Sequence, residues 1–309
     1  PVPPGSGWVG EAPSPGPRFH PPRIKDCERV GTLLHARTSM GLVNSVINSI
    51  AFPRPPPGYS EADLLRQEDL VFIRTQRGLR VPAIHRRAKR PGPRYTVIYS
   101  HGNAEDVGLS LSYIDALSRR LDADVLAYEY PGYSVSDGEP SEAGVYESAS
   151  AAWHYLERTC GVPPEGIVLL GRSLGSAPTV YLAARQPRLA GMMLQSPLAS
   201  GLRVIAGNCA ALCLRPCDPF GNIYRVKSVE CPSVVIHGKA DDVVPYWNGL
   251  AMHRALQQMG LAAEPMWVEG RGHNDMPEDR CVDHMRTFME SLPPPPPETN
   301  MASRATAEI

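Results

Sequence analysis

One serine, Ser173, stands in a pattern of residues that could make it a nucleophile. Residues 167–175 read Ile-Val-Leu-Leu-Gly-Arg-Ser-Leu-Gly, so a short apolar run leads directly into Gly-x-Ser-x-Gly, and residues 176–185 are compatible with a helix. Gly171 and Gly175 have no Cβ, which lets a strand and a helix approach each other on either side of a sharp turn. This order is typical of a nucleophile elbow and predicts acyl transfer through Ser173. A turn that is merely rich in Gly and Ser is the alternative.

A serine hydroxyl needs a base beside it, and a carboxylate must hold that base in one tautomer. After a nucleophile elbow these partners follow in the order Asp or Glu, then His. Asp241 and Asp242 come just after the apolar run 233–237, and His273 lies in a glycine-flanked loop after the last strand-like run. We assign His273 as the base and Asp241 as its carboxylate, with Asp242 left open because composition cannot separate neighbours. Asp275 is predicted to cap the loop instead.

Four other histidines are assigned structural roles. His101 and His237 each close a predicted strand, where packing or a local hydrogen bond is the simpler interpretation. His154 and His253 fall within predicted helices, where a solvated or partly packed side chain is expected.

Stabilisation of a tetrahedral intermediate requires backbone N–H groups aimed at its oxyanion, each worth ~3 kcal/mol of the barrier. Leu174 follows the nucleophile at the start of the elbow helix and is predicted to supply one donor. The second is expected from the loop 100–104, which follows an earlier strand. We assign it to Asn103, with Ala104 as the alternative.

Strand-like and helix-like segments alternate through the middle of the chain. Strands are predicted at 70–75, 81–86, 95–99, 124–130, 167–171, 190–195, 233–237 and 264–268, and helices at 107–121, 141–158, 176–185, 246–259 and 278–292. The first two strands are expected to be antiparallel. The alternation predicts an α/β fold with a mostly parallel sheet and helices on both faces, whose reactive groups lie beyond the carboxyl ends of the strands. Residues 196–232 leave room for a helix or two but for no large cap domain, so an acyl chain attached to a bulky partner could enter.

Composition excludes several other classes of protein. The 309 residues carry a formal net charge of −1, which provides no basic field for nucleic acid, and no run approaches the ~20 apolar residues of a membrane-spanning helix. The seven cysteines are odd in number and irregularly spaced, which argues against a disulfide framework and for a reducing compartment. Cys209, Cys213 and Cys217 have helical spacing and are interpreted as one helix face rather than a zinc site. No metal or organic cofactor is expected.

Prolines mark the predicted ends of the folded domain. They crowd residues 1–22, 53–57 and 293–297. We predict a Pro-rich disordered segment at 1–58, a folded domain at 59–292 and a disordered tail at 293–309.

Within the N-terminal segment, residues 41–50 form a candidate membrane anchor. Met40-Gly41 with Ser45 matches the N-myristoylation pattern if Met40 begins the mature chain. Apolar and polar residues of 42–50 separate onto two helical faces, which would add the second membrane contact that a single myristoyl chain needs. An amphipathic helix packed on the folded domain is the alternative.

Four longer strings carry a resemblance to a known family. They are residues 99–104 (Tyr-Ser-His-Gly-Asn-Ala), 128–133 (Tyr-Glu-Tyr-Pro-Gly-Tyr), 195–204 (Gln-Ser-Pro-Leu-Ala-Ser-Gly-Leu-Arg-Val) and 267–274 (Trp-Val-Glu-Gly-Arg-Gly-His-Asn). Over about residues 51–292 the chain resembles the α/β-hydrolase domain-containing protein 17 family. These are membrane-associated serine hydrolases that remove palmitate from S-acylated cysteines.

The resemblance implies the α/β-hydrolase fold and a catalytic role for Ser173, Asp241 and His273, and so favours Asp241 over Asp242. It implies S-acylated proteins as substrates and the cytoplasmic face of membranes as the location, and we expect a monomer. Plant-type members resemble this chain in beginning Met-Gly, whereas the N-terminal cysteine cluster of animal members is absent here. Arg172 stands where the family usually has Gln. Two alternatives stay open: an esterase, lipase or peptidase of the same fold, and a non-enzymatic membrane scaffold.

Overall fold

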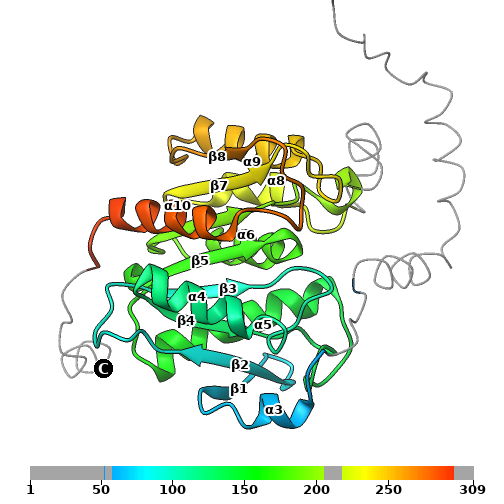
Figure 1. Ribbon diagram of the computed structural model, residues 1–309, viewed down its shortest axis with the longest axis vertical. Helices are drawn as coiled ribbons and strands as arrows, with labels where there is room; N and C mark the ends of the chain where they lie inside the picture. The colour runs from blue at the N-terminus through cyan, green and yellow to red at the C-terminus, as the bar shows by residue number, and fades with distance from the viewer. Residues whose placement is uncertain (1–51, 53–57, 205–217, 296–309) are drawn as a thin grey trace, which may run out of the picture. The chain divides into compact units, whose positions relative to one another are not determined.

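An eight-stranded sheet forms the centre of the computed structural model, which describes residues 52, 58–204 and 218–295 (Figure 1). The strand order is β1-β2-β4-β3-β5-β6-β7-β8. Strand β2 pairs antiparallel with β1 and β4, and all other pairs are parallel, which confirms the predicted mostly parallel sheet. The strands are β1 Leu70–Arg74, β2 Arg80–Arg86, β3 Thr96–Ser100, β4 Asp124–Tyr128, β5 Ile167–Arg172, β6 Gly191–Gln195, β7 Ser233–Gly238 and β8 Met266–Val268.

Helices cover both faces of the sheet, as the alternation predicted. Helices α4 and α10 lie over one face, and α5, α6 and α9 over the other (Figure 1). The helices are α3 Glu61–Leu65, α4 Leu111–Leu121, α5 Glu142–His154, α6 Ser176–Ala183, α8 Asn222–Arg225, α9 Trp247–Gln258 and α10 Glu278–Ser291. None of them has both the length and the apolar character of a membrane-spanning helix, within the ranges that are described.

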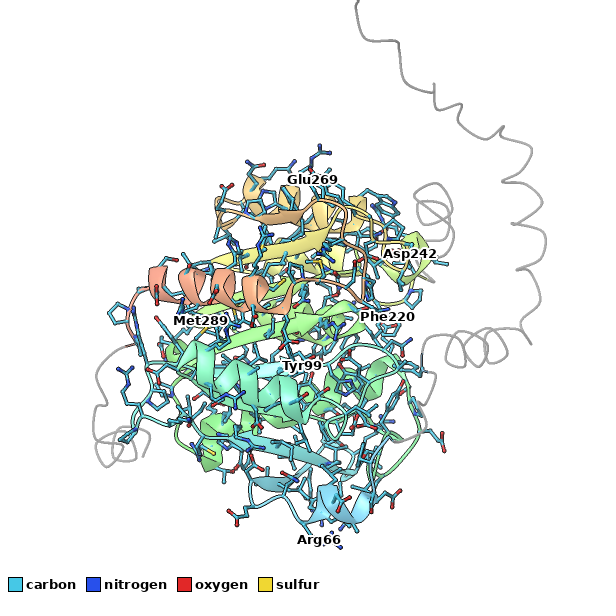
Figure 2. The ribbon with its side chains drawn as sticks, viewed as in Figure 1. Arg66, Tyr99, Phe220, Asp242, Glu269 and Met289 are labelled. Carbon is cyan, nitrogen blue, oxygen red and sulfur yellow. The ribbon has the colours of Figure 1, made fainter. Side chains whose placement is uncertain are left out.

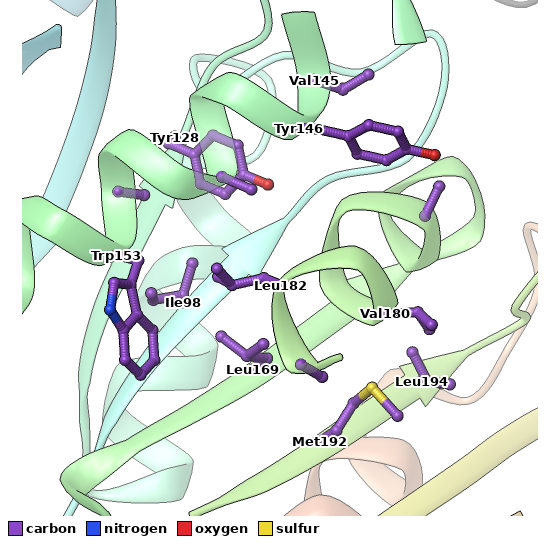
Figure 3. Packing of buried hydrophobic residues seen from close by; sticks show 14 of the residues in the cluster. Ile98, Tyr128, Val145, Tyr146, Trp153, Leu169, Val180, Leu182, Met192 and Leu194 are labelled. Carbon is purple, nitrogen blue, oxygen red and sulfur yellow. The ribbon is translucent and has the colours of Figure 1, made fainter. Parts of the chain in front are cut away.

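The central strands are buried on both faces because helices cover both. Val97 of β3 packs in the cluster under α4 and α10, whereas the next residue, Ile98, packs in the cluster under α5 and α6. Figure 3 shows Ile98 and Leu169 of the sheet close to Trp153 of α5 and Leu182 of α6. These apolar layers hold the strand ends, and therefore the loops that follow them, in fixed positions.

Two helix starts illustrate how local hydrogen bonds set the boundaries. The Ser141 hydroxyl accepts a hydrogen bond from the Gly144 N–H at 3.1 Å and so caps α5 where the predicted helix 141–158 begins. Helix α4 begins at Leu111 rather than at the predicted residue 107. Asp106 accepts hydrogen bonds from the N–H groups of Leu109 and Ser110, which hold residues 107–110 as a turn before the helix.

One described residue of the predicted N-terminal segment, Phe52, packs against the folded domain. Phe52 is only 5% exposed, and its ring contacts the rings of Tyr133 and Phe220 edge-to-face at centroid distances of 6.4 and 5.9 Å. Gly41, the candidate helix 41–50, Cys209, Cys213 and Cys217, and residues 296–309 of the tail lie outside the described residues. Between β6 and β7 the described residues form only short helices, and no large cap is evident.

Candidate active site

The backbone at Ser173 makes the sharp turn that the sequence pattern predicted. Ser173 directly follows β5 and is the first residue of the 3-10 turn that leads into α6. Its φ of 52° lies in the left-handed region that non-glycine residues rarely adopt. A Cβ on Gly171 would lie 2.5 Å from the Thr179 hydroxyl oxygen, and one on Gly175 would lie 2.0 Å from the Ser100 carbonyl oxygen. Only glycine fits at both positions, and this close packing fixes the serine between β3 and α6.

The structure brings together the three side chains that the sequence assigned to the site. The Ser173 Oγ lies 2.9 Å from His273 Nε2, and His273 Nδ1 lies 2.8 Å from Asp241 Oδ2. Ser173 and His273 are each 8% exposed and Asp241 is 6% exposed, so water screens these contacts little. With the proton on Nδ1, Nε2 is free to accept the serine proton. The arrangement can therefore activate the hydroxyl.

Asp241, and not its neighbour Asp242, faces the imidazole. Its Oδ1 accepts hydrogen bonds from the Val243 and Val244 N–H groups at 3.0 and 2.7 Å, which directs Oδ2 toward His273. Burial alone would raise the pKa of Asp241, but hydrogen bonds from His237 and His273 outweigh it and hold that pKa well below its usual value. Asp242 is exposed, and Figure 2 shows it at the edge of the molecule.

The loop that carries His273 is packed directly against the end of β7. A Cβ on Gly238 would lie 2.2 Å from the Arg271 carbonyl oxygen, so this strand end and the histidine loop meet at backbone distance. The Asp275 Oδ1 accepts a hydrogen bond from the Gly272 N–H at 2.6 Å. Asp275 therefore caps the loop, as predicted.

The loop after β3 lies against the elbow, where an oxyanion donor is needed. A Cβ on Gly175 would also lie 2.6 Å from the His101 carbonyl oxygen, which places the first residues of this loop against the elbow. The Ala104 N–H donates to the Asn103 Oδ1 at 3.1 Å, whereas no described residue accepts a hydrogen bond from the Asn103 N–H. The Ala104 N–H is therefore already engaged, and the Asn103 N–H stays the predicted donor to an oxyanion.

His237 supports Asp241, a role that the sequence analysis missed. Its Nε2 lies 2.8 Å from the Val244 carbonyl oxygen and 3.2 Å from Asp241 Oδ2. Both neighbours are acceptors, so Nε2 carries the proton and donates to them. His237 and Asp241 are four residues apart across a strand end, and this spacing could have predicted their contact.

A second missed contact involves Arg172, the residue that precedes the nucleophile. Its guanidinium forms an ion pair with Glu105, whose other oxygen accepts a hydrogen bond from the Gly102 N–H at 3.1 Å. Burial would lower the pKa of Arg172, but the Glu105 charge raises it. The pair ties the elbow to the loop after β3.

The remaining histidines occupy the positions expected of them. His101 and His237 are buried and hydrogen-bonded at strand ends, and His154 is half exposed on α5. In the described ranges, no group of three or more His, Cys, Asp or Glu side chains is placed to bind a metal ion.

The fold matches known hydrolases. A family model described as alpha/beta hydrolase fold matches residues 95–214, and one described as prolyl oligopeptidase family matches residues 214–290. The esterase Pf2001 of Pyrococcus furiosus is similar over 78% of this chain and 98% of its own, with a TM-score of 0.60 at 16% identity. Est1E of Butyrivibrio proteoclasticus is similar over 71% of this chain and 98% of its own, with a TM-score of 0.59 at 15% identity. The chain has the α/β-hydrolase fold.

Relatives with similar sequences identify the family within this fold class. Alpha/beta hydrolase domain-containing protein 17C of Xenopus tropicalis is 43% identical over 215 residues, which are 68% of this chain and 67% of the relative. The human protein of that name is 42% identical over 219 residues (71% and 64%), and alpha/beta hydrolase domain-containing protein aho-3 of Caenorhabditis elegans is 34% identical over 268 residues (80% and 78%). The chain belongs to the α/β-hydrolase domain-containing protein 17 family, and is thus a hydrolase of the α/β-hydrolase superfamily.

Proposed function

We propose that this protein is a serine thioesterase that removes palmitate from S-acylated cysteines of other proteins. The observation that carries the proposal is the hydrogen-bonded series from Ser173 through His273 to Asp241, at 2.9 and 2.8 Å. Its geometry is that of a serine nucleophile with an oriented base. The family resemblance supplies the acyl-cysteine substrate.

The reaction proceeds in two steps. His273 Nε2 takes the hydroxyl proton while the Ser173 Oγ bonds to the thioester carbonyl carbon, and the N–H groups of Leu174 and Asn103 hold the oxyanion. The intermediate collapses, the carbon–sulfur bond breaks, and the leaving cysteine sulfur receives the proton from His273. A water molecule then loses a proton to His273 and attacks the acyl-enzyme. Palmitate leaves and Ser173 regains its proton.

The connection between β6 and β7 supports a protein-bound substrate. Residues 196–204 and 218–232 contain only short helices among the described residues, so no large cap stands over Ser173 there. An acyl chain attached to a folded protein needs such open access, whereas a small free ester does not.

The test compares two peptides that differ in one atom. A peptide carrying S-palmitoyl cysteine is expected to be cleaved with a kcat/KM at least about tenfold above that of the same peptide carrying O-palmitoyl serine, a ratio equal to ~1.4 kcal/mol of transition-state stabilisation. Ser173→Ala provides the blank. Equal or faster cleavage of the oxygen ester would reassign the protein as an esterase.

A peptidase is the second candidate, because residues 214–290 match the prolyl oligopeptidase family model. Cleavage of unacylated peptides, absent in Ser173→Ala, would favour it. A scaffold without activity is the third. Failure of folded wild-type protein to react with a fluorophosphonate probe would favour the scaffold.

We also propose that the protein lies on the cytoplasmic face of membranes through a myristoyl group on Gly41. In a chain started at Met40, Gly41→Ala is expected to move the protein from the membrane to the soluble fraction. The myristoylation pattern requires glycine as the residue that accepts the acyl chain, so the variant would carry no myristoyl group. Asn44→Ala, at an unspecified position of the pattern, is the control and should remain on the membrane. Membrane association that survives Gly41→Ala would exclude myristate as the anchor.

A further inference from the structure

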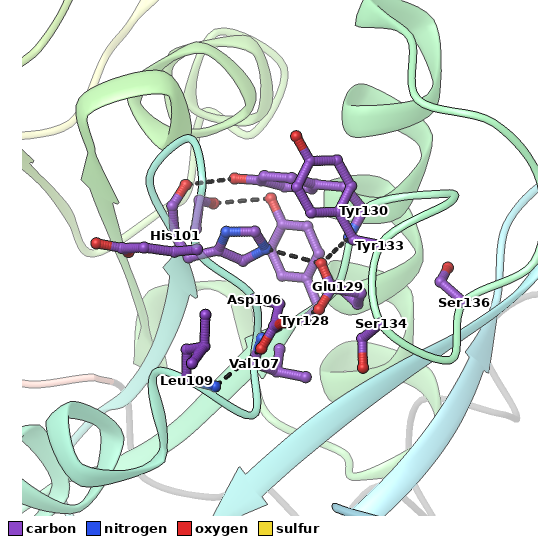
Figure 4. A network of polar contacts seen from close by, with 12 residues as sticks. His101, Asp106, Val107, Leu109, Tyr128, Glu129, Tyr130, Tyr133, Ser134 and Ser136 are labelled. Atoms are coloured by element: carbon purple, nitrogen blue, oxygen red, sulfur yellow. Dashed lines mark hydrogen bonds and ion pairs between the residues drawn. The ribbon is translucent and has the colours of Figure 1, made fainter. Parts of the chain in front are cut away.

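His101 is a buried histidine whose two ring nitrogens both lie close to oxygen acceptors, and Figure 4 shows the contact of one of them with Glu129. Nδ1 lies 2.9 Å from the Gly102 carbonyl oxygen, and Nε2 lies 3.0 Å from Glu129 Oε1. A neutral imidazole carries one N–H and would leave a lone pair pointing at one of these oxygens. Donation at both nitrogens requires the imidazolium.

The surroundings of the ring also favour the cation. His101 and Glu129 have side chains that are 1% and 0% exposed, so water contributes little to either charge and each depends on the other. The Tyr130 ring lies over the imidazole at a centroid distance of 4.1 Å with the ring planes tilted by 32°, in reach of a cation–π attraction. Burial alone would lower the pKa of His101, but the Glu129 carboxylate outweighs it and raises that pKa.

Both carboxylate oxygens of Glu129 take part in hydrogen bonds. Oε1 accepts from the Tyr130 N–H at 2.8 Å in addition to His101, and Oε2 accepts from the Val107 N–H at 3.0 Å. The Tyr130 hydroxyl closes the network by donating to the His101 carbonyl oxygen at 2.7 Å. These bonds join the end of β4 to the loop after β3 (Figure 4).

Other titratable groups around the ring do not oppose this charge state. They are two carboxylates, two tyrosines and an arginine that is ion-paired to one of the carboxylates: Glu105, Asp106, Tyr130, Tyr133 and Arg172. Burial raises the pKa of Asp106, and the charge of Glu105 is balanced by Arg172. His101 and Glu129 therefore neutralise mainly each other at this strand end.

The Gly102 carbonyl that His101 binds belongs to the same peptide unit as the Asn103 N–H. We propose that the buried ion pair of His101 and Glu129 is a positioning device for the oxyanion site: it fixes the plane of the Gly102–Asn103 peptide and polarises its N–H toward the oxyanion. A charged donor on the carbonyl oxygen withdraws electron density from the amide, and bonded chains strengthen one another in this way. The inference depends on the proposed function, because it concerns the oxyanion of the same acyl transfer.

Glu129→Gln tests the device with little change in side-chain size. Without the anion, His101 becomes neutral and cannot donate at both nitrogens, so its bond to Gly102 or to residue 129 is lost. We expect kcat per active site to fall roughly tenfold, a part of the ~10²-fold or greater cost of losing a whole oxyanion donor. KM should be unchanged, and an alkyl trifluoromethyl ketone, whose adduct with Ser173 carries an oxyanion, should bind about tenfold more weakly.

Asp124→Asn is the matched control. Asp124 is a buried carboxylate at the other end of β4, bonded to the Ala88 N–H and the Arg87 guanidinium, each at 2.7 Å. The Asp124→Asn substitution also replaces a carboxylate by an amide, but it does so away from the loop 100–104. If Glu129→Gln resembles this control, with a lowered melting temperature but unchanged kcat and unchanged ketone affinity, the pair is only structural and the proposal is wrong. Recovery of kcat in Glu129→Asp, which restores the charge, would support it.

A measurement on the wild-type protein decides the charge state even if the variants fail to fold. Nitrogen-15 shifts of the His101 ring at pH 8 should show both nitrogens protonated. A neutral ring would overturn the proposal. If the wild-type protein hydrolyses no ester or thioester, the proposed function fails, and this outcome is distinct because the ring shifts and the ketone affinities can still be measured.

Discussion

His273→Ala is expected to lower kcat for acyl release by roughly 10⁶-fold, about as much as Ser173→Ala. His273 is the only side chain recorded within hydrogen-bond distance of the Ser173 hydroxyl among the described residues. Without the imidazole, the hydroxyl keeps its proton near neutral pH and attacks the carbonyl poorly. Single-turnover acyl release and labelling by a fluorophosphonate probe measure this loss.

His154→Ala is the control for the loss of a histidine. His154 is half exposed at the end of α5 and has no contact with Ser173, so its variant should keep full activity. Added imidazole should restore a small part of the activity of His273→Ala, because the vacated space lies beside the serine. If His273→Ala keeps more than about one hundredth of the wild-type rate, another group is the base and the assignment is wrong.

Asp241→Asn is expected to lower kcat by roughly 10⁴-fold without unfolding the protein. The new amide can keep its oxygen toward the Val243 and Val244 N–H groups, which places its NH₂ against His273 Nδ1. His273 must then carry its proton on Nε2, where it faces Ser173 and cannot accept the serine proton. The NH₂ also faces the His237 Nε2–H, so two donors oppose each other.

Asp242→Asn separates this effect from a general loss of negative charge. Asp242 is the adjacent residue and is exposed, so its variant should keep wild-type kcat. Comparable losses in the two variants would contradict the distinct role of Asp241.

The pH dependence of stability gives a second readout for Asp241. Its folded-state pKa is lowered, so the carboxylate stabilises the folded state above its unfolded pKa of about 4. That contribution is lost as the pH falls through the folded-state pKa. The free energy of unfolding of the wild-type protein should therefore drop in acid more steeply than that of Asp241→Asn. Parallel curves for the two proteins would show that Asp241 is not ionised and paired in the folded state.

Local sequence patterns determined the parts of this protein whose geometry arises within a few consecutive residues. The strand, turn and helix around Ser173 follow from apolar β-rich residues and two glycines that allow close backbone contact. The cap at Ser141 and the loop cap at Asp275 likewise depend on partners three residues away. Such contacts have short loops to close, and the residue types at each position suffice to predict them.

Only the tertiary structure decided which side chains meet across the sheet. The contact of Asp241 with His273 depends on the backbone approach of β7 to the histidine loop, and residue type alone does not separate Asp241 from the adjacent Asp242. The pairing of His101 with Glu129 joins residues 28 positions apart at the ends of neighbouring strands. The register of the sheet, set by apolar packing on both faces, brings such residues together, and no local pattern specifies that register.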